Sequence, residues 1–336
     1  MTTFGRKLTG IIDINTWDGR IACSSPPVGG YPDGPCFNAG FADGIPSNRI
    51  NPNVGADNYR TNAFSSNYHA LQMSVRKSYS SGLTLTGNYT WSKALDDLSD
   101  AFNNRNALRP TDNLNPGLDY GPADFDLRHR IVATVGYDLP FMKNNRWLGG
   151  WGTNSIVSWQ TGHPFSVYSS SSSYDPNKDG YRTDRLVTTG AAPSGTILSG
   201  SAADACTIAA AAPGAGGGKC YFDTSMWARF AYDPSLHPAQ VACPGGALAC
   251  NPPIGRNTLF GPHFVNVDFN VSKKFKITEG SSLTFQANFF DLFNHPNFLT
   301  PTTGANRSSA TYGQLTATGG DSGGHRVTQL ALRFDF

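Results

Sequence analysis

Apolar and polar residues alternate strictly along the last part of the chain, residues 327–336. One side of the pattern carries Leu330, Leu332, Phe334 and Phe336, and the other carries Gln329, Arg333 and Asp335. A period of two residues predicts a β-strand with one apolar and one polar face. Because chain ends usually fray, a terminal strand with so regular a pattern is expected to pair within a sheet.

The same alternation recurs in earlier segments, which are residues 71–76, 83–91, 131–139, 151–159, 265–272 and 283–289. Ser80, Ser81 and Gly82 provide a tight hairpin turn between the first two of them. No segment shows a comparable helical period. The sequence therefore predicts an all-β chain whose antiparallel strands follow one another up and down.

The connections between these strands alternate in length. Short connections lie at residues 80–82, 140–147 and 276–282, and long ones at residues 10–67, 92–127, 161–262 and 291–325. A transmembrane β-barrel places short periplasmic turns at one end and long extracellular loops at the other. The spacing thus predicts an antiparallel transmembrane β-barrel segment of about seven or eight strands. A soluble β-sandwich with alternating core strands is the alternative.

Both faces of the strands fit a barrel in the outer membrane of a Gram-negative bacterium. The polar face is rich in Thr, Asn, Gln and Ser, which suits a hydrated lumen, while the apolar face would contact outer-membrane lipid. Aromatic residues near strand ends would form an interfacial girdle: Tyr89, Trp91, Tyr137, Trp147, Trp151 and Trp159. Phe334 and Phe336 are expected on the periplasmic side, as an assembly signal for the barrel-assembly machinery.

Composition excludes several other classes of protein. Charged residues make up 15% of the chain, and 37 glycines and 22 prolines accompany them. The net charge of +2 gives no basic patch of the kind that nucleic-acid binding needs. No apolar run approaches the roughly 20 residues of a membrane helix. Residues 1–20 lack the apolar centre of a secretory signal, so either the chain is cytosolic or its front end is not in this sequence.

Five segments resemble the C-terminal barrel of TonB-dependent outer-membrane receptors of the Oar-like type. They are NYHALQMSV (67–75), GNYTWSKALDD (87–97), DFDLRHRIV (124–132), GRNTLFGPHFVNVD (255–268) and ANFFDLFNHPNF (287–298). Their order and spacing match from about residue 4 to residue 336. The resemblance implies a plugged barrel of roughly 22 strands. Such a receptor takes up a bulky ligand with energy passed through the TonB complex, which contacts the plug.

The chain departs from that family in lacking a recognisable plug, TonB-contacting segment and signal peptide. It is therefore expected to be a fragment of such a receptor. Residues 1–66 would hold a remnant strand, within residues 1–12, and an extracellular loop. Residues 67–336 would hold the C-terminal barrel strands, with long loops at 92–127, 161–262 and 291–325. The alternative is a self-contained barrel of eight strands that uses residues 1–12 as its first strand and acts as a porin or as an adhesion or structural protein.

The cysteines fall in two of the long connections, at Cys23, Cys36, Cys206, Cys220, Cys243 and Cys250. No C-x-x-C spacing occurs, which argues against a zinc or redox motif. An even number of cysteines in an oxidising compartment favours loop disulfides. The simplest pairing joins each cysteine to its nearest neighbour in sequence, while other connectivities and free thiols stay open.

A calcium site is predicted in the third long connection. The stretch YDPNKDGYRTD (174–184) places Asp175, Asn177 and Asp179 at alternate positions before a glycine, as in the first half of a calcium loop. The carbonyl of Tyr181 would supply the next ligand. Leu186 stands where a bidentate Glu belongs, so Asp184 would have to substitute, and binding should be weak. A hydrophilic turn that satisfies local backbone amides is the alternative.

No enzymatic motif is present, and the seven histidines are scattered without metal-ligand spacing. Asp124, Asp126, Arg128 and Arg130 at a strand start could be catalytic charges, but ion pairs that steady the mouth of the barrel are the favoured interpretation. We therefore expect no enzymatic activity and no cofactor other than the calcium ion. Loops rich in Asn, Ser, Gly and aromatic residues suit a carbohydrate or peptide ligand.

Overall fold

The computed structural model describes most of the strand regions of the chain. The described residues are 2–13, 58–99, 116–140, 145, 147–168, 185–188, 221, 227–228, 255–301, 306, 309, 312–315, 317–319 and 325–336. They form one large antiparallel sheet in the order β1-β2-β3-β5-β6-β11-β12-β15, with β4 paired to β3 beside this path, and three two-stranded sheets, β10-β7, β13-β14 and β8-β9. No helix in the described part of the chain is long and apolar enough to cross a membrane.

The long strands of the sheet are β1 (Thr2–Asp13), β2 (Asn58–Ser80), β3 (Leu83–Asp96), β5 (His129–Asp138), β6 (Trp151–Gln160), β11 (Phe264–Lys276), β12 (Ser282–Phe290) and β15 (Val327–Asp335). The short elements are η2 (Pro116–Asp119), β4 (Gly121–Pro122), β7 (Pro164–Phe165), β8 (Val187–Thr188), β9 (Trp227–Ala228), β10 (Leu259–Phe260), β13 (Asn297–Phe298) and β14 (Thr318–Gly319). Every strand expected from the alternation is present, and each pairs with the next long strand along the chain.

The first two strands are longer than the sequence pattern indicates. β1 is a complete strand that pairs with β2 from Thr2 opposite Ala70 to Asp13 opposite Asn58. β2 begins at Asn58, well before the alternating segment that starts at residue 71. The register shifts between Leu8 and Gly10, which marks a β-bulge. A bulge interrupts the period of two, so an alternation search does not find this part of the pair.

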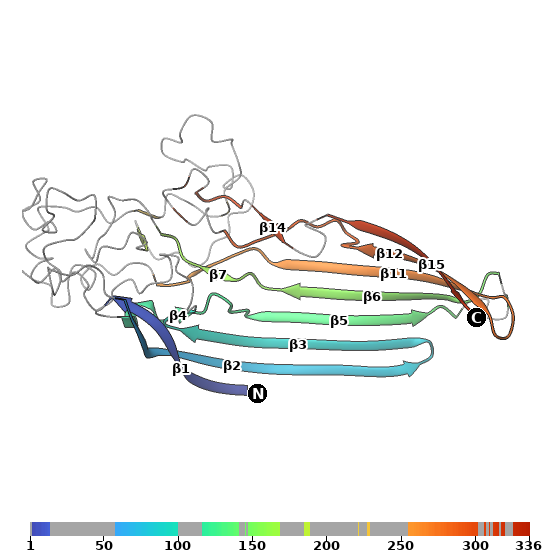
Figure 1. The fold of residues 1–336 in the computed structure, drawn as a ribbon, viewed down its shortest axis with the longest axis horizontal. Coiled ribbons are helices and arrows are strands. Elements are labelled where there is room, and N and C mark those ends of the chain that lie inside the picture. Colours follow the sequence, from blue (N-terminus) through green and yellow to red (C-terminus); the bar gives the residue numbers. More distant parts are fainter. Residues whose placement is uncertain are drawn as a thin grey trace, which may run out of the picture.

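All short connections lie at one end of the sheet and all long ones at the other, as Figure 1 shows. We call these the turn end and the loop end. At the turn end, Ser81 and Gly82 have φ values of 54° and 84°. Positive values at both central residues are typical of a two-residue hairpin turn whose twist matches that of the flanking strands. A Cβ on Gly82 would lie 2.7 Å from the carbonyl oxygen of Asp138, so only glycine fits there.

The register brings the alternating apolar positions of the strands from β2 to β15 onto one face of the sheet. Met73, Tyr89, Ile131, Trp159 and Val265 are successive partners across β2, β3, β5, β6 and β11. Their neighbours two residues along each strand, such as Leu71 and Trp91, continue this apolar face. On β15 the same face carries Leu330, Leu332 and Phe334, which pair with Ala287, Phe285 and Leu283 of β12.

The opposite face is mostly polar, although Val132 and Ile156 also lie on it. A row of hydroxyl and amide side chains, interrupted by one glycine, crosses this face. The row consists of Thr84, Gly136, Asn154, Asn270, Asn288 and Gln329, which are partners from β3 to β15. The amide of Asn270 donates to Asn288 at 2.6 Å. A water-facing surface of this composition matches the lumen side that the sequence predicts.

The apolar face has no second layer of described residues over it. Leu330 is 66% exposed and Leu332 is 68% exposed, whereas a core leucine would be covered. The buried hydrophobic cluster lies instead in the loop-end elements, and it consists of Phe165, Val167, Leu186, Tyr221, Leu259 and Tyr312. This arrangement contradicts the soluble-sandwich alternative, in which the apolar face of the sheet would be the core.

The two outer strands of the sheet each have one partner. Within the described residues β1 pairs only with β2, and β15 pairs only with β12. The sheet therefore has two edges in this structure, at β1 and at β15.

Candidate functional site: the polar rim at the loop end

The end of β3 is fixed to its surroundings by two adjacent carboxylates. Asp96 is fully buried, and its two carboxylate oxygens accept hydrogen bonds from the Ser99 hydroxyl at 3.1 and 2.9 Å. Asp97 accepts from both the backbone N–H and the hydroxyl of Ser65 on β2, at 3.0 and 2.8 Å. Short oxygen side chains that bind nearby backbone groups are favoured where a strand gives way to a loop.

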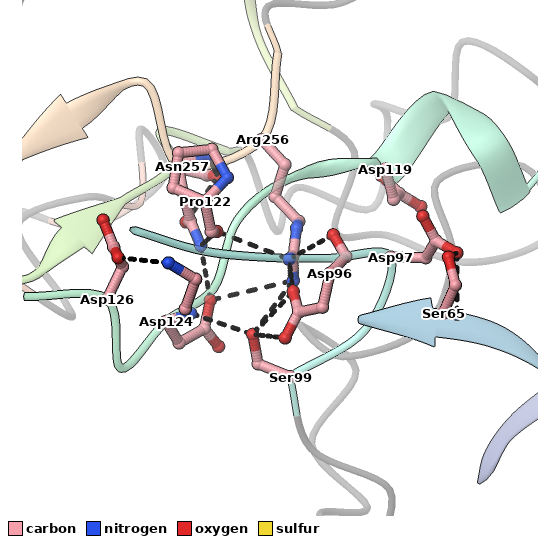
Figure 2. Close-up of polar contacts among 12 residues, drawn as sticks. Ser65, Asp96, Asp97, Ser99, Asp119, Pro122, Asp124, Asp126, Arg256 and Asn257 are labelled. Atoms are coloured by element: carbon pink, nitrogen blue, oxygen red, sulfur yellow. Dashed lines mark hydrogen bonds and ion pairs between the residues drawn. The ribbon is translucent and has the colours of Figure 1, made fainter. Parts of the chain in front are cut away.

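Arg256 joins this strand end to a segment far along the chain. Its guanidinium forms an ion pair with the Asp96 carboxylate and donates to the Asp96 carbonyl at 2.8 Å, a contact between residues 160 positions apart. It also donates to the Ser99 hydroxyl at 3.3 Å and lies 3.9 Å from a carboxylate oxygen of Asp124 (Figure 2). Burial lowers the pKa of Arg256 to about 10, so the side chain is still cationic near neutral pH.

Asn257 extends the same contacts to two more segments. Its side-chain amide donates to the Pro122 carbonyl on β4 at 2.7 Å and to Asp124 at 2.6 Å. Its backbone N–H donates to the Ser166 hydroxyl, just after β7, at 2.7 Å. The φ of Asn257 is 57°, a conformation that asparagine adopts more readily than most residues. We call Asp96, Ser99, Pro122, Asp124, Arg256 and Asn257 the rim clamp.

Two further acidic residues are paired beside the clamp. Asp126 is 2% exposed, accepts from the backbone N–H of Ala94 at 2.6 Å and lies 3.5 Å from Arg128. Asp119, at the end of the 3-10 turn η2, forms a buried ion pair with Arg185. The buried charges of the rim are therefore matched by opposite charges or by backbone donors, as burial requires.

These contacts support the interpretation that the charges at residues 124–130 steady the mouth of the sheet. Asp126 pairs with Arg128, and Asp124 contacts Arg256 and Asn257. Arg130 departs from this expectation, because it lies in β5 between Thr90 and Gln160 and forms no ion pair with the described residues. The rim clamp joins β3, β4, the segment after β7 and the segment before β10, so its contacts hold loops together.

Most of the other site residues expected from the sequence lie outside the described residues. These are Asp175, Asn177, Asp179, Tyr181 and Asp184 of the calcium loop and the cysteines Cys23, Cys36, Cys206, Cys220, Cys243 and Cys250. Leu186, which replaces the acidic ligand of a complete calcium loop, is described and is fully buried in the loop-end cluster. Among the described residues, no group of three or more His, Cys, Asp or Glu side chains could hold a metal ion.

The two terminal aromatic residues lie on the apolar face at the turn end. Phe334 is 53% exposed and Phe336 is 97% exposed, and their rings stack with centroids 5.9 Å apart. The alternation from residue 327 onward is thus confirmed, with the C-terminus beside the short turns (Figure 1).

The rim clamp itself was not found by sequence reasoning. Asp96 and Arg256 lie within the segments GNYTWSKALDD and GRNTLFGPHFVNVD, but neither segment indicates that the two residues meet. The only local signal is a set of short polar residues directly after β3 and before β10, where chain direction changes.

Comparison with known proteins supports the fold class. A search of curated protein sequences finds no match. A family model described as an outer membrane beta barrel domain matches residues 1–329. The match covers almost the whole chain, and it agrees with an antiparallel sheet that has one exposed apolar face, one polar face and long connections at one end. The chain belongs to the outer membrane beta barrel domain family and is an integral protein of the outer membrane.

Proposed function

We propose that this chain forms part of the wall of a TonB-dependent receptor that takes up a bulky ligand across the outer membrane. The observation that carries the proposal is the pair of free edges on a sheet whose apolar face belongs in lipid. Unpaired backbone groups cannot remain in hydrocarbon, so β1 and β15 each need a second partner, which in a receptor wall is a further strand. Large barrels with a plugged lumen are the class that the five sequence motifs resemble.

In this proposal the turn end faces the periplasm and the loop end faces the cell exterior. The rim clamp then holds the outer loops in a fixed arrangement around the ligand entrance. The row of hydroxyl and amide side chains on the polar face lines the lumen. Neutral amide and hydroxyl groups suit a carbohydrate or peptide ligand, since each can donate and accept hydrogen bonds. Energy would reach the receptor from the TonB complex through a plug.

The second candidate is a self-contained barrel that acts as a porin or as an adhesion or structural protein. One observation favours it: the sheet has eight long strands in sequence order, and eight is about the smallest number that closes a membrane barrel. Closure would require β1 to pair with β15.

The size of the native species separates the two candidates. The protein would be isolated from outer membranes without heating, and its mass would be measured in detergent. If the chain is part of a receptor wall, the mass of the native species should be well above the 36.0 kDa of this chain, because the other strands of the receptor barrel accompany it. Thr3 on β1 is opposite His69 of β2, so a photo-crosslinking residue in its place should capture β2 in either case, and in a receptor wall its second product should involve a segment other than β15. A folded species of 36.0 kDa with a crosslink between β1 and β15 would overturn the receptor proposal.

The terminal aromatic residues would serve assembly in either case. We expect the barrel-assembly machinery to bind the end of β15 through Phe334 and Phe336, since both rings are exposed on the apolar face. Phe336→Ser should reduce the amount of assembled protein in the outer membrane. The control is Thr328→Ser at the opposite end of the same strand, and equal assembly of the two variants would exclude this role.

A further inference from the structure

Lys273 is a cation buried on the apolar face of the sheet. It lies in β11 near the turn end, where its register partners are Trp151 of β6 and Phe285 of β12. Only 2% of the residue is exposed, although neighbouring apolar side chains on the same face, such as Phe285 at 38%, are partly open. A buried lysine on a lipid-facing surface requires an explanation, because an isolated ammonium is costly to remove from water.

Two aromatic rings lie close to the ammonium group. Its Nζ atom lies 5.5 Å from the ring centroid of Trp151 and 4.9 Å from that of Phe275. Trp147 packs edge-on against Phe275 with ring centroids 6.2 Å apart. Both Nζ distances are within the range of attractive cation–π interactions, which are strongest with tryptophan. We call Lys273, Trp147, Trp151 and Phe275 the lysine cage.

The rings stabilise the charge of Lys273 but do not use its hydrogen-bond donors. Nζ has no hydrogen-bond partner among the described residues, although an ammonium carries three N–H donors. No ion pair joins Lys273 to a carboxylate within that part of the chain; Asp335, near the same end, pairs with Arg333 at 2.7 Å. The cage therefore has a positive charge and unused donors, and it lacks an acceptor with negative charge.

The position of the cage indicates where such an acceptor would come from. Tryptophan side chains of membrane proteins lie at the level of the lipid headgroups, where phosphodiester oxygens are the abundant anionic acceptors. Trp147, which packs against Phe275, is 73% exposed, so an aromatic ring at the edge of the cage is open to the surrounding lipid. Lysine side chains near membrane interfaces characteristically reach toward headgroups along an apolar surface.

We infer that the lysine cage is a binding site for a phosphodiester headgroup, supplied by a phospholipid of the leaflet at the turn end. The phosphate accepts hydrogen bonds from Nζ, and the indole rings pack against the glycerol and the upper acyl chain. The site depends on the outer-membrane location of the apolar face. It does not depend on whether the barrel is a receptor wall or self-contained, so it can stand if the TonB proposal fails.

The test uses the full chain purified from outer membranes in a detergent without phosphate, with bound lipid counted by native mass spectrometry. Three probes separate the source of the phosphate: phosphatidylglycerol, diacylglycerol with the same acyl chains, and inorganic phosphate. We expect retention of phosphatidylglycerol and not of diacylglycerol, with inorganic phosphate competing only weakly. Inorganic phosphate that bound as tightly as the lipid would show a free-anion site and overturn the lipid assignment.

Matched variants test the residues. Lys273→Gln should weaken phosphatidylglycerol binding about tenfold, the loss expected for one charge-assisted hydrogen bond. Lys77→Gln is the control, because Lys77 lies on the same face at the same end of the sheet but is exposed on β2, opposite Leu85. The proposal would be overturned if Lys273→Gln bound phosphatidylglycerol as tightly as the wild type. It would also be overturned if Lys77→Gln weakened binding as much as Lys273→Gln does.

Two further variants cover the case in which Lys273→Gln does not fold. Trp151→Leu keeps the lysine but removes one wall of the cage, and Lys273→Arg keeps the charge and its donors. We expect reduced lipid retention in Trp151→Leu and near wild-type retention in Lys273→Arg, with folding checked by migration of unheated samples on gels. Full retention in a folded Trp151→Leu protein, or complete loss in a folded Lys273→Arg protein, would contradict a cage that binds through this cation.

Discussion

The sheet and the loop-end rim of this protein differ in where they place apolar side chains. On the sheet, Leu332 is 68% exposed on the apolar face, while polar rows such as Asn154, Asn270 and Asn288 line the other face. At the rim, Leu186 is fully buried among aromatic and aliphatic residues. The rim is organised like a small soluble protein, and the sheet is organised for lipid outside and water inside. The solvent each region meets therefore decides which side chains stabilise it.

Charges differ between the regions in the same way. The rim holds the buried pairs of Asp96 with Arg256 and Asp119 with Arg185. The exposed end of β15 holds the pair of Arg333 with Asp335, whose side chains are 74% and 40% exposed. A buried pair is costly to break because the remaining charge stays desolvated, whereas an exposed pair contributes little. This contrast between regions can be tested by substitution.

The largest effect is expected from Arg256→Ala. Removal of the guanidinium leaves the fully buried Asp96 carboxylate uncompensated, which should reduce local stability of the rim by about 3–5 kcal/mol. Hydrogen exchange measured at residues 94–99 and 121–126 should accelerate, while β5 and β6 should stay protected. The control Arg333→Ala should change stability by about 0–1 kcal/mol. Uniform loss of protection across sheet and rim would contradict the separation of the two regions.

The next largest effect on stability is expected from a charge placed on the apolar face of a strand. Val157 lies at the centre of β6 on the apolar face, opposite Ala133 and Val267, and Ser158 lies on the polar face. Val157→Arg should cost about 2–4 kcal/mol near the membrane midplane, whereas Ser158→Arg points into the lumen and should cost little. The free energies of unfolding of the two variants, measured in lipid vesicles, give the comparison. Equal costs would refute the assignment of the faces.

A smaller effect is expected at the hairpin between β2 and β3. Gly82→Ala forces an L-residue into a positive φ, at a cost of about 1–2 kcal/mol, and adds a carbon near the Asp138 carbonyl. Ser81→Gly, at the neighbouring residue with positive φ, should leave stability unchanged or raise it. The same unfolding experiment measures both variants, and an unaffected Gly82→Ala protein would argue against this turn geometry.

The smallest effect is expected from calcium at residues 174–184. With few charged ligands, the proposed site should bind with a dissociation constant on the order of 10⁻⁴–10⁻³ M. Millimolar calcium should then slow proteolysis next to Lys178 and Arg182 in the intact protein, and Asp179→Asn should abolish that protection. Cleavage that is unchanged by calcium would leave the hydrophilic turn as the better interpretation. Rim clamp contacts should be unaffected by calcium in either outcome.

The sequence by itself determined the long strands from the second half of β2 onward, their order and their faces. Strands such as β3, β5 and β12 follow a period of two, and each pairs with its neighbour in the chain, so local information is sufficient. Tertiary structure decided the features that depend on distant residues. The bulge that extends β1 and β2 breaks the local period. The contact of Asp96 with Arg256 spans 160 positions, and the cage around Lys273 draws one ring from β6 and another from β11. Alternation specifies the face on which a side chain lies, but its burial and its partners depend on which distant residues the folded chain brings beside it.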